Sequence, residues 1–375
     1  MIIAVNTRLL ISGKLEGIGC FTSETLSRIT RNHPEHQFLF IFDRPFADEF
    51  VFSGNVTPIV LAPPTRHPLL WYIWFEFQIP RILKKYQADL FFSPDGYLSL
   101  NTKTKQLAAI HDINFVHRPK DLPWLKSAYY NYFFPKFAHK ARRIVTVSFF
   151  SKKDIHETYS IGDDKIDVVF NGANTRYRPT SEDEQQMTRA RFSGGKSYFL
   201  FIGALHPRKN ICGLLLAYDT FRASAESDVK LLIVGESMFK TKGIRKIYRS
   251  LQHKDDVVFT GRLSNEDLQQ VLGAALALTF VPFFEGFGIP VIEAMNAGVP
   301  VICSNTTSLP EVGGDAVYYV DPSSAGQIAD AMARIFHEKE LRESLVEKGF
   351  AQKEKFSWDQ TAGLLWKSMM DCVKN

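Results

Sequence analysis

Two glutamates, Glu285 and Glu293, stand eight positions apart around a glycine-rich loop. The loop follows an apolar stretch that we interpret as a strand (277–281) and leads into a predicted helix. Both carboxylates should therefore lie at the carboxyl end of a parallel sheet, where open α/β folds bind ligands. Gly286 and Gly288 lack a Cβ, so their backbone can approach an anion at the helix N-terminus closely. This arrangement favours phosphate binding.

Glu293 is predicted in the first turn of that helix, where its carboxylate could accept both hydroxyl protons of a ribose diol beside the phosphate. The alternative is an ordinary buried strand and helix, whose dipole favours acidic residues in the first turn. The two glutamates alone leave both interpretations open.

A basic loop, residues 203–210 (GALHPRKN), also follows a predicted strand and precedes a predicted helix. Arg208 offers a planar fork of donors and Lys209 a compact charge. Together they suit a diphosphate that gains negative charge as a bond to it breaks. A solvated basic turn is the alternative, but the position at a strand's carboxyl end favours a binding site. We assign His206 no role.

Residues 280–302 (FVPFFEGFGIPVIEAMNAGVPVI) resemble the E-x7-E signature of retaining glycosyltransferases of family 4, which have the GT-B fold. Six further blocks resemble that family in its order: HDINF, TVSFFSKKDI, VVFNGAN, FIGALHPRKN, FTGRLSNEDL and LPEVGGDAVYYVDP. The resemblance implies an α/β fold of GT-B architecture, with two doubly wound Rossmann-like domains facing each other across a cleft. It also implies a bacterial, mannosyltransferase-like enzyme.

The resemblance further implies the site residues. Catalytic roles fall to His111, Arg208, Lys209 and Glu285, with Glu285 on the donor sugar. Contacts with the nucleotide sugar fall to a larger set: Gly17, Gly19, Ser148, Asn171, Gly203, Arg262, Leu263, Gly286, Phe287, Gly288, Ile289 and Glu293. Two of these assignments have structural alternatives, because Ser148 could cap a helix over 149–159 and His111 could be a structural histidine held by Asp112.

The reaction that the resemblance implies is transfer of a sugar from a nucleoside diphosphate to an acceptor hydroxyl, with retention at the anomeric carbon. Mannose from GDP-mannose is the leading expectation, and bacterial surface polysaccharide or lipopolysaccharide the expected product. No cofactor or divalent cation is expected, because Arg208 and Lys209 would supply the positive charge. Alternatives are a non-catalytic nucleotide-sugar-binding subunit, a sugar-nucleotide epimerase and a phosphorylase.

Composition agrees with a large two-domain enzyme of 375 residues, 45% of them hydrophobic. The four cysteines show neither metal-ligand nor redox spacing, which predicts a reducing, cytoplasmic compartment and no metal site. The N-terminus reads as a first strand and not as a signal peptide, and no apolar run reaches the ~20 residues needed to cross a bilayer. The glycine loop after that strand has Thr22 where a dinucleotide-binding dehydrogenase would need its third glycine, which argues against an oxidoreductase.

Positive charge is concentrated in residues 1–178, which hold 23 Lys and Arg against 16 Asp and Glu. No nucleic-acid-binding motif accompanies it, so we expect an anionic membrane surface or a lipid-linked saccharide acceptor as the partner. The segment 67–86, rich in aromatic and basic residues, could rest peripherally on the inner face of the cell membrane. The alternative is that its aromatics are the packed face of a core helix.

Short apolar strands alternate with helical periods along the chain, as in parallel βαβ units. Eleven strands are predicted, at 2–8, 37–42, 90–93, 106–110, 143–147, 166–170, 199–202, 230–234, 257–259, 276–281 and 299–303. A polar, aperiodic stretch at 172–184 is the linker candidate. We therefore predict an acceptor domain over 1–178, onto which a C-terminal helix at 357–375 packs back, and a donor domain over 179–356.

Overall fold

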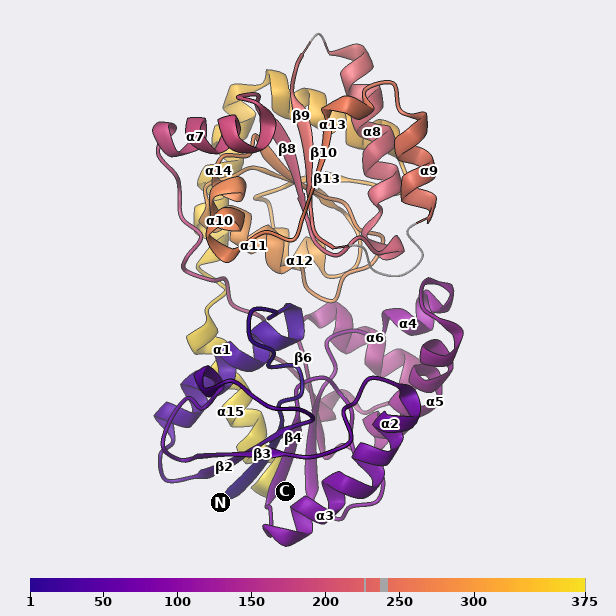
Figure 1. The fold of residues 1–375 in the computed structure, drawn as a ribbon, viewed down its shortest axis with the longest axis vertical. Helices are drawn as coiled ribbons and strands as arrows, with labels where there is room; N and C mark the ends of the chain where they lie inside the picture. Colours follow the sequence, from indigo (N-terminus) through magenta and orange to yellow (C-terminus); the bar gives the residue numbers. More distant parts are fainter. Residues whose placement is uncertain (226, 237–241, 375) are drawn as a thin grey trace. The chain divides into compact units, whose positions relative to one another are not determined.

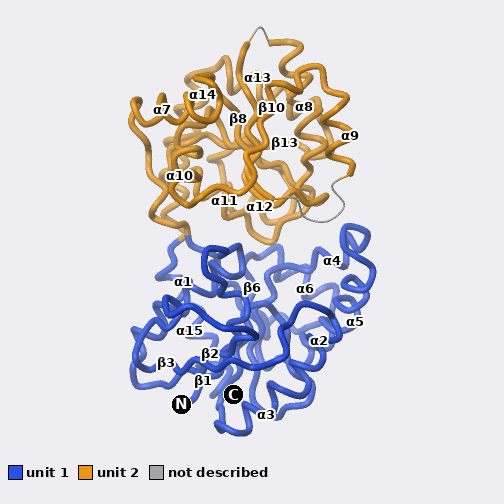
Figure 2. Tube along the Cα trace, viewed as in Figure 1, with its two compact units in different colours: residues 1–172, 357–375 blue, residues 173–356 orange. Residues whose placement is uncertain are grey.

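The computed structural model describes residues 1–225, 227–236 and 242–374. It divides into two compact units, one formed by Met1–Gly172 with Ser357–Asn375 and the other by Ala173–Phe356 (Figure 2). The sequence prediction set the corresponding boundaries at 178/179 and 356/357.

Each unit is built on one parallel sheet (Figure 1). The first sheet has the order β3-β2-β1-β4-β5-β6-β7, with β1 Ile2–Asn6, β2 Gln37–Phe42, β3 Val56–Val60, β4 Leu90–Ser93, β5 Lys105–Ala109, β6 Arg143–Thr146 and β7 Ile166–Val168. The second has the order β10-β9-β8-β11-β12-β13, with β8 Tyr198–Ile202, β9 Lys230–Val234, β10 Val257–Gly261, β11 Ala277–Phe280, β12 Val301–Ser304 and β13 Tyr318–Val320. In both sheets the strand order reverses beside the first strand, which makes a topological switch point between β1 and β4 and between β8 and β11.

Helices cover both faces of each sheet, and two buried clusters line the two faces of the first. In the first unit they are α1 Gly17–Asn32, α2 Pro68–Ile73, a π-helical turn Trp74–Gln78, α3 Ile79–Lys85, α4 Asn114–His117, α5 Trp124–Lys140, α6 Phe149–Tyr159 and α15 Trp358–Lys374. In the second they are α7 Glu182–Ser193, α8 Ile211–Ser224, α9 Lys242–Ser250, α10 Asn265–Gly273, α11 Ile289–Asn296, α12 Leu309–Gly313, α13 Ala325–His337 and α14 Lys339–Lys353. This is the predicted α/β class with two parallel, doubly wound sheets.

The C-terminal helix α15 packs on α1 in the first unit (Figure 1). A Cβ on Gly172 would lie 2.3 Å from the backbone nitrogen of Trp358, so only glycine lets the two chain segments approach this closely. Thr361 Oγ1 donates a hydrogen bond to the carbonyl of Phe170, 2.7 Å away. Gly172 therefore has a packing task, namely to seat the returning helix.

Two strands were missed from the sequence, and both lie at sheet edges. β3 contains Pro58, which lacks the N–H that a central strand requires but is tolerated at an edge. β13 has only three residues between glycine-rich and polar flanks. Two expected loops were also wrong. Gly17 and Gly19 lie in the first turn of α1, and the candidate linker ends earlier because Ser181 and Glu184 form a capping box that starts α7.

Candidate functional site

The loops that follow β8 and β11 meet at the switch point of the second sheet. β8 and β11 are neighbouring parallel strands, so their carboxyl ends lie side by side. Two bonds tie the loops together: the amide of Phe283 donates to the carbonyl of Arg208 (2.8 Å), and Asn210 Nδ2 donates to the carbonyl of Val281 (3.1 Å). The chain thereby brings residues about 75 positions apart into one site.

Arg208, Lys209 and Glu285 form one charged cluster at this site. Arg208 Nη1 donates to Glu285 Oε1 at 2.5 Å and to the carbonyl of Phe284 at 3.0 Å. Lys209 Nζ pairs with the same carboxylate oxygen and lies 4.9 Å from the centre of the Phe280 ring. The sequence predicted that these three residues share a site, and it missed that the carboxylate pairs directly with both cations.

Burial opposes ionisation of Glu285, but the charges of Arg208 and Lys209 outweigh it and hold the pKa of this carboxyl below its usual range. Glu285 is therefore an anion between two cations, and this cluster of three side chains carries one net positive charge. Both cations thus pair with a carboxylate of the protein, and their predicted role on a ligand phosphate stays a prediction.

Two hydroxyl side chains after β12 fix the loop of Glu285. Ser308 Oγ donates to the carbonyls of Glu285 (2.9 Å) and Phe287 (3.0 Å), and Thr307 Oγ1 accepts from the amide of Glu285 (3.3 Å). Sequence reasoning missed both residues. The signal available was their position after β12, the neighbour of β11, directly before the block LPEVGGDAVYYVDP that resembles the family.

Gly288 has to be glycine. Its φ of +112° is unfavourable for other residues, and a Cβ would lie 2.5 Å from Leu309 Cδ2. Gly288 is also the N-cap of α11, which begins at Ile289. In the first turn Pro290 has no N–H, and the amide of Val291 donates to the carbonyl of Gly288 at 3.0 Å. The anion-binding role predicted for residues 286–289 stays a prediction.

The loop after β8 needs a close backbone approach as well. Gly203 has φ +148°, and a Cβ on Gly235 would lie 1.9 Å from the carbonyl oxygen of Gly203. Gly235 was missed from the sequence, although a glycine directly after a strand was a usable signal. His206, to which we gave no role, caps the turn Pro207–Lys209, since its Nδ1 accepts from the amide of Arg208 at 3.2 Å.

Glu293 lies in the second turn of α11, not the first as predicted, because the helix begins at Ile289. Its side chain is partly exposed, and among the described residues no donor lies within hydrogen-bond distance of the carboxyl. Burial raises the pKa of Glu293 to about 8, against the opposing charge of Arg176. The carboxyl therefore has both oxygens available and is largely neutral at pH 7.

Arg262 and Leu263 follow β10 in the turn that leads to α10. Arg262 is exposed and Leu263 partly so, and Gly261 turns the chain there with φ +70°. The structure thus puts both residues at the carboxyl end of a strand two places from β8. Their predicted role at the base stays a prediction.

His111 follows β5 in the first unit and is held differently from our expectation. Its Nε2 lies 2.9 Å from the carbonyl of Pro94, which can only accept, so Nε2 carries the proton and Nδ1 is left as an acceptor. Asp112 was predicted to hold the imidazole, but it accepts instead from the amide of Asn114 at 3.0 Å. Burial lowers the pKa of His111, so the ring is neutral near pH 7.

Of the other site residues predicted in the first unit, some have a structural role and others have none that the structure shows. Ser148 caps α6 by accepting from the amide of Ser151 at 3.0 Å, which was the structural alternative. A Cβ on Gly19 would lie 2.8 Å from the carbonyl of Leu9, whereas one on Gly17 would meet nothing within 4 Å. Asn171 is buried, and its Oδ1 has no partner among the described residues.

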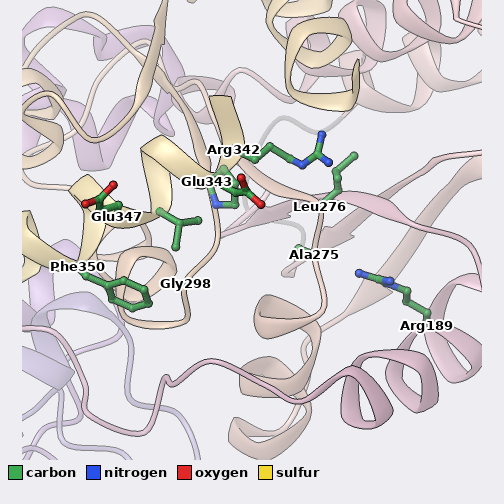
Figure 3. A pocket seen from close by; sticks show the side chains of 10 residues that line it. Arg189, Ala275, Leu276, Gly298, Arg342, Glu343, Glu347 and Phe350 are labelled. Carbon is green, nitrogen blue, oxygen red and sulfur yellow. The ribbon is translucent and has the colours of Figure 1, made fainter. Parts of the chain in front are cut away.

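A pocket of about 570 Å³ in the second unit lies away from these loops. Its floor is the chain that enters β11 and β12, at the amino ends of those strands (Figure 3). Its walls are contributed by α7 and α14, with Arg189, Arg342, Glu343 and Glu347 among the lining residues. None of the predicted site residues lines it.

Three expectations about partners can be compared with the described residues. Within them, no helix is long and apolar enough to cross a membrane, and no three His, Cys, Asp or Glu side chains are gathered as a metal site would need. In the segment 67–86, Trp71, Trp74 and Phe75 are buried in the core, whereas Tyr72 and Phe77 are exposed, so its membrane contact stays a prediction.

Two models of known protein families match this chain. The family model "Glycosyltransferase Family 4" matches residues 27–177, and "Glycosyl transferases group 1" matches residues 182–352. The two models follow one another along the chain and cover most of both units. The chain belongs to the family 4 glycosyltransferases, of GT-B fold. The predicted family and fold class are therefore confirmed.

Relatives of this glycosyltransferase include mannosyltransferases. It is 28% identical to O-antigen chain mannosyltransferase B of Escherichia coli, over 92% of this chain and 93% of that one. It is 26% identical to the O-antigen chain mannosyltransferase RfbU of Salmonella typhimurium, over 72% and 71%.

Solved structures share the fold of this glycosyltransferase. Sucrose-phosphate synthase of Thermosynechococcus elongatus superposes with a TM-score of 0.78 at 16% identity, over 99% of each chain. HepE of Anabaena, solved with UDP-glucose, gives 0.76 at 15% identity, over 99% of this chain and 100% of that one. The fold is therefore kept at sequence identities too low to carry substrate specificity.

Proposed function

We propose that this glycosyltransferase transfers mannose from GDP-mannose to a saccharide hydroxyl, with retention at the anomeric carbon and without a metal ion. The observation that carries the proposal is the pairing of Arg208 and Lys209 with one carboxylate at the switch point of the second sheet. Two adjacent cations with a single internal anion suit a ligand that brings a diphosphate.

In the proposed reaction the departing diphosphate gains negative charge as the bond to the sugar breaks. Arg208 and Lys209 stabilise that charge, and the amides at the N-terminus of α11 add their dipoles. The acceptor hydroxyl attacks from the same face as the departing oxygen, which takes the hydroxyl proton. The bond to the diphosphate breaks, the new glycosidic bond forms, and the proton ends on the nucleoside diphosphate, so no second catalytic carboxylate is needed.

The other predicted residues position the donor. Glu293 has both oxygens available to accept from a ribose diol, and Arg262 and Leu263 would receive the base. Glu285, released from the cations by the diphosphate, would accept from hydroxyls of the donor sugar. His111 Nδ1 would accept from a sugar hydroxyl. These roles rest on the contacts described above and on the resemblance to the family.

The proposed acceptor is a saccharide, free or lipid-linked, in bacterial surface polysaccharide synthesis on the cytoplasmic side of the membrane. The proposal draws on the two relatives described above, both O-antigen chain mannosyltransferases that align with most of the chain. The excess of positive charge in residues 1–178 agrees with an acceptor that is linked to an anionic lipid diphosphate.

The test is turnover of GDP-mannose, compared with UDP- and ADP-sugars, by wild type and Arg208→Ala. We expect Arg208→Ala to lower turnover by about 100-fold or more, the order found when a partner of developing charge is removed. Arg191→Ala is the matched control, because Arg191 is an exposed arginine of the same unit that pairs with Asp267. A loss below about threefold, or nucleotide binding without turnover of any donor, would contradict the proposal.

A further inference from the structure

Large apolar side chains gather on the outward side of α2, the π-helical turn and α5 in the first unit. We call this surface the aromatic strip and define it by Leu69, Tyr72, Phe77, Trp124, Leu125 and Tyr132, all of them exposed. We propose that the aromatic strip is the face on which this enzyme rests on an anionic lipid bilayer. The inference deepens the proposed function, on which it rests for the lipid-linked acceptor, but it is tested without the reaction.

Ring contacts connect the aromatic strip from α5 to α2 and the π-helical turn. The ring of Tyr132 lies 4.9 Å from that of Phe133, Phe133 lies 5.9 Å from Tyr72, and Tyr72 lies 5.9 Å from Phe77, as centroid distances. Behind them, the buried Trp71 of α2 packs against Tyr129 and Tyr130 of α5. The exposed rings of Tyr72, Phe77 and Tyr132 therefore belong to one surface held in place by a buried aromatic layer, and they are not isolated apolar residues.

Helix α5 shows which way the strip faces. Its buried residues are Ser127, Tyr129, Phe134, Phe137 and Ala138. By contrast, Trp124, the first residue of the helix, is 79% exposed, and Tyr132 is 59% exposed. A tryptophan and a tyrosine that present a flat apolar ring with a polar edge suit the interface between lipid headgroups and acyl chains.

The exposed charged residues of α2, the π-helical turn, α3 and α5 have one sign. Helix α5 contains no acidic residue. The single acidic residue of α2, the π-helical turn and α3 is Glu76, which is buried and accepts from the amides of Leu100 and Asn101. Exposed basic residues lie in the same helices: Arg81, Lys84, Lys85, Lys136, His139 and Lys140.

Lys136 shows how the charges and rings share the surface. Its Nζ lies 3.3 Å from the centre of the Tyr132 ring. A basic side chain that lies on an aromatic ring and keeps its amine at the surface is what membrane-facing helices use to reach headgroup phosphates. Charge complementarity therefore selects an anionic lipid surface as the occupant.

A second copy of this chain fits the strip less well. A two-fold contact would place the same surface of each copy together. That would bring six basic residues of one copy against those of the other, with no exposed acidic residue of these helices to compensate. Like charges in contact are unfavourable, so we expect the strip to stay uncovered in solution.

The experiment is binding of the whole protein to vesicles without nucleotide sugar. Vesicles of phosphatidylcholine alone are compared with vesicles that contain about a third phosphatidylglycerol, at low and at high salt. Trp124 serves as reporter, because Trp71, Trp74 and Trp358 are buried and Trp366 stacks on His33. We expect binding to anionic vesicles at low salt, with a blue shift and quenching by brominated lipid that Trp124→Phe removes.

Two variants locate the contact. Trp124→Ser with Tyr132→Ser should weaken vesicle binding about tenfold or more, and Lys136→Gln should weaken it about fivefold. Met187→Ser and Lys339→Gln are the matched controls, since both lie exposed on the second unit. Equal binding by the variants, binding to neutral vesicles alone, or concentration-dependent dimers through the strip would overturn the inference. Donor hydrolysis should be unchanged in these variants, which separates a failure here from a failure of the proposed function.

Discussion

Replacement of Glu293 by glutamine should abolish a proton release that accompanies nucleotide binding. The wild-type carboxyl is largely neutral at pH 7 because burial raises its pKa to about 8. Two donors from a ribose diol favour the ionised form, because hydrogen bonds to a carboxylate are roughly twice as strong as those to a neutral group. Binding should therefore expel the proton of Glu293, and Glu293→Gln, which has the same shape and no proton to lose, should not show it.

The magnitude follows from the pKa. With a value of about 8, roughly nine-tenths of the free protein carries this proton at pH 7, so close to one proton should leave per nucleotide bound. If only the ionised form binds the ribose well, the affinity should rise about tenfold between pH 7 and pH 9 and then level off. Glu293→Gln should bind more weakly than wild type at pH 9, with a flat profile over the same range.

Titration calorimetry with GDP in two buffers of different ionisation enthalpy measures the proton count directly. The nucleotide's own phosphate titrates equally in both proteins, so the difference between wild type and Glu293→Gln isolates residue 293. Glu347→Gln on α14 is the control for the loss of a glutamate elsewhere in the same unit. Equal proton release by wild type and Glu293→Gln would refute the assignment of Glu293 to the ribose.

Glu285→Gln should bind GDP about tenfold more tightly, because Arg208 and Lys209 lose a competing charged partner, and its turnover should fall. Equal or weaker binding in calorimetry would contradict the idea that the diphosphate replaces Glu285 as the partner of these cations. Gly288→Ala should destabilise the second unit by about 1–3 kcal/mol and weaken nucleotide binding, as followed by thermal melting, whereas Gly363→Ala, with nothing within 4 Å of its Cβ, should do neither. The folded pKa of Glu293 lies above its unfolded value, so its contribution to stability is full below about pH 4.5 and is lost as pH rises through about 8. Glu293→Gln should therefore match wild-type stability at pH 5 and exceed it at pH 9 in thermal melts. Transferase activity should survive excess EDTA, and loss of activity with rescue by magnesium or manganese would show that the two cations do not suffice.

Much of the fold was predictable because parallel strands buried on both faces are short continuous apolar runs. β2 (QFLFIF) and β8 (YFLFI) are examples of such runs. The edge strands were not predictable in this way, since an edge needs neither continuous apolar residues nor every backbone N–H. Pro58 in β3 broke the pattern at a position where the structure tolerates it.

Within the site, residue types were predictable and partners were not. The charges of Arg208, Lys209 and Glu285 were visible in the sequence, but their pairing depends on β8 and β11 being neighbours, which is a property of the strand order. The same holds for His111, where the adjacent Asp112 was the obvious partner and the carbonyl of Pro94, from the loop after the neighbouring β4, is the actual one. Short-range reasoning favours sequence neighbours, whereas a parallel sheet brings together loops far apart in the chain.

The two glutamates that first marked the site differ in charge state because their surroundings differ. Glu285 faces two cations, and its pKa is held low, so it is an anion that the proposed diphosphate would have to displace. Glu293 is half-buried without a hydrogen-bond donor among the described residues, and it holds a proton that the proposed ribose diol would release. A ligand that carries only a diphosphate would leave Glu293 neutral. A nucleoside, which carries only the ribose diol, would leave the cations paired with Glu285. Mutual dependence of this kind favours ligands that carry both groups at a fixed separation, as nucleoside diphosphates do. In calorimetry, GDP should therefore bind wild type more tightly than guanosine alone and more tightly than pyrophosphate alone, because only GDP engages both Glu293 and the two cations.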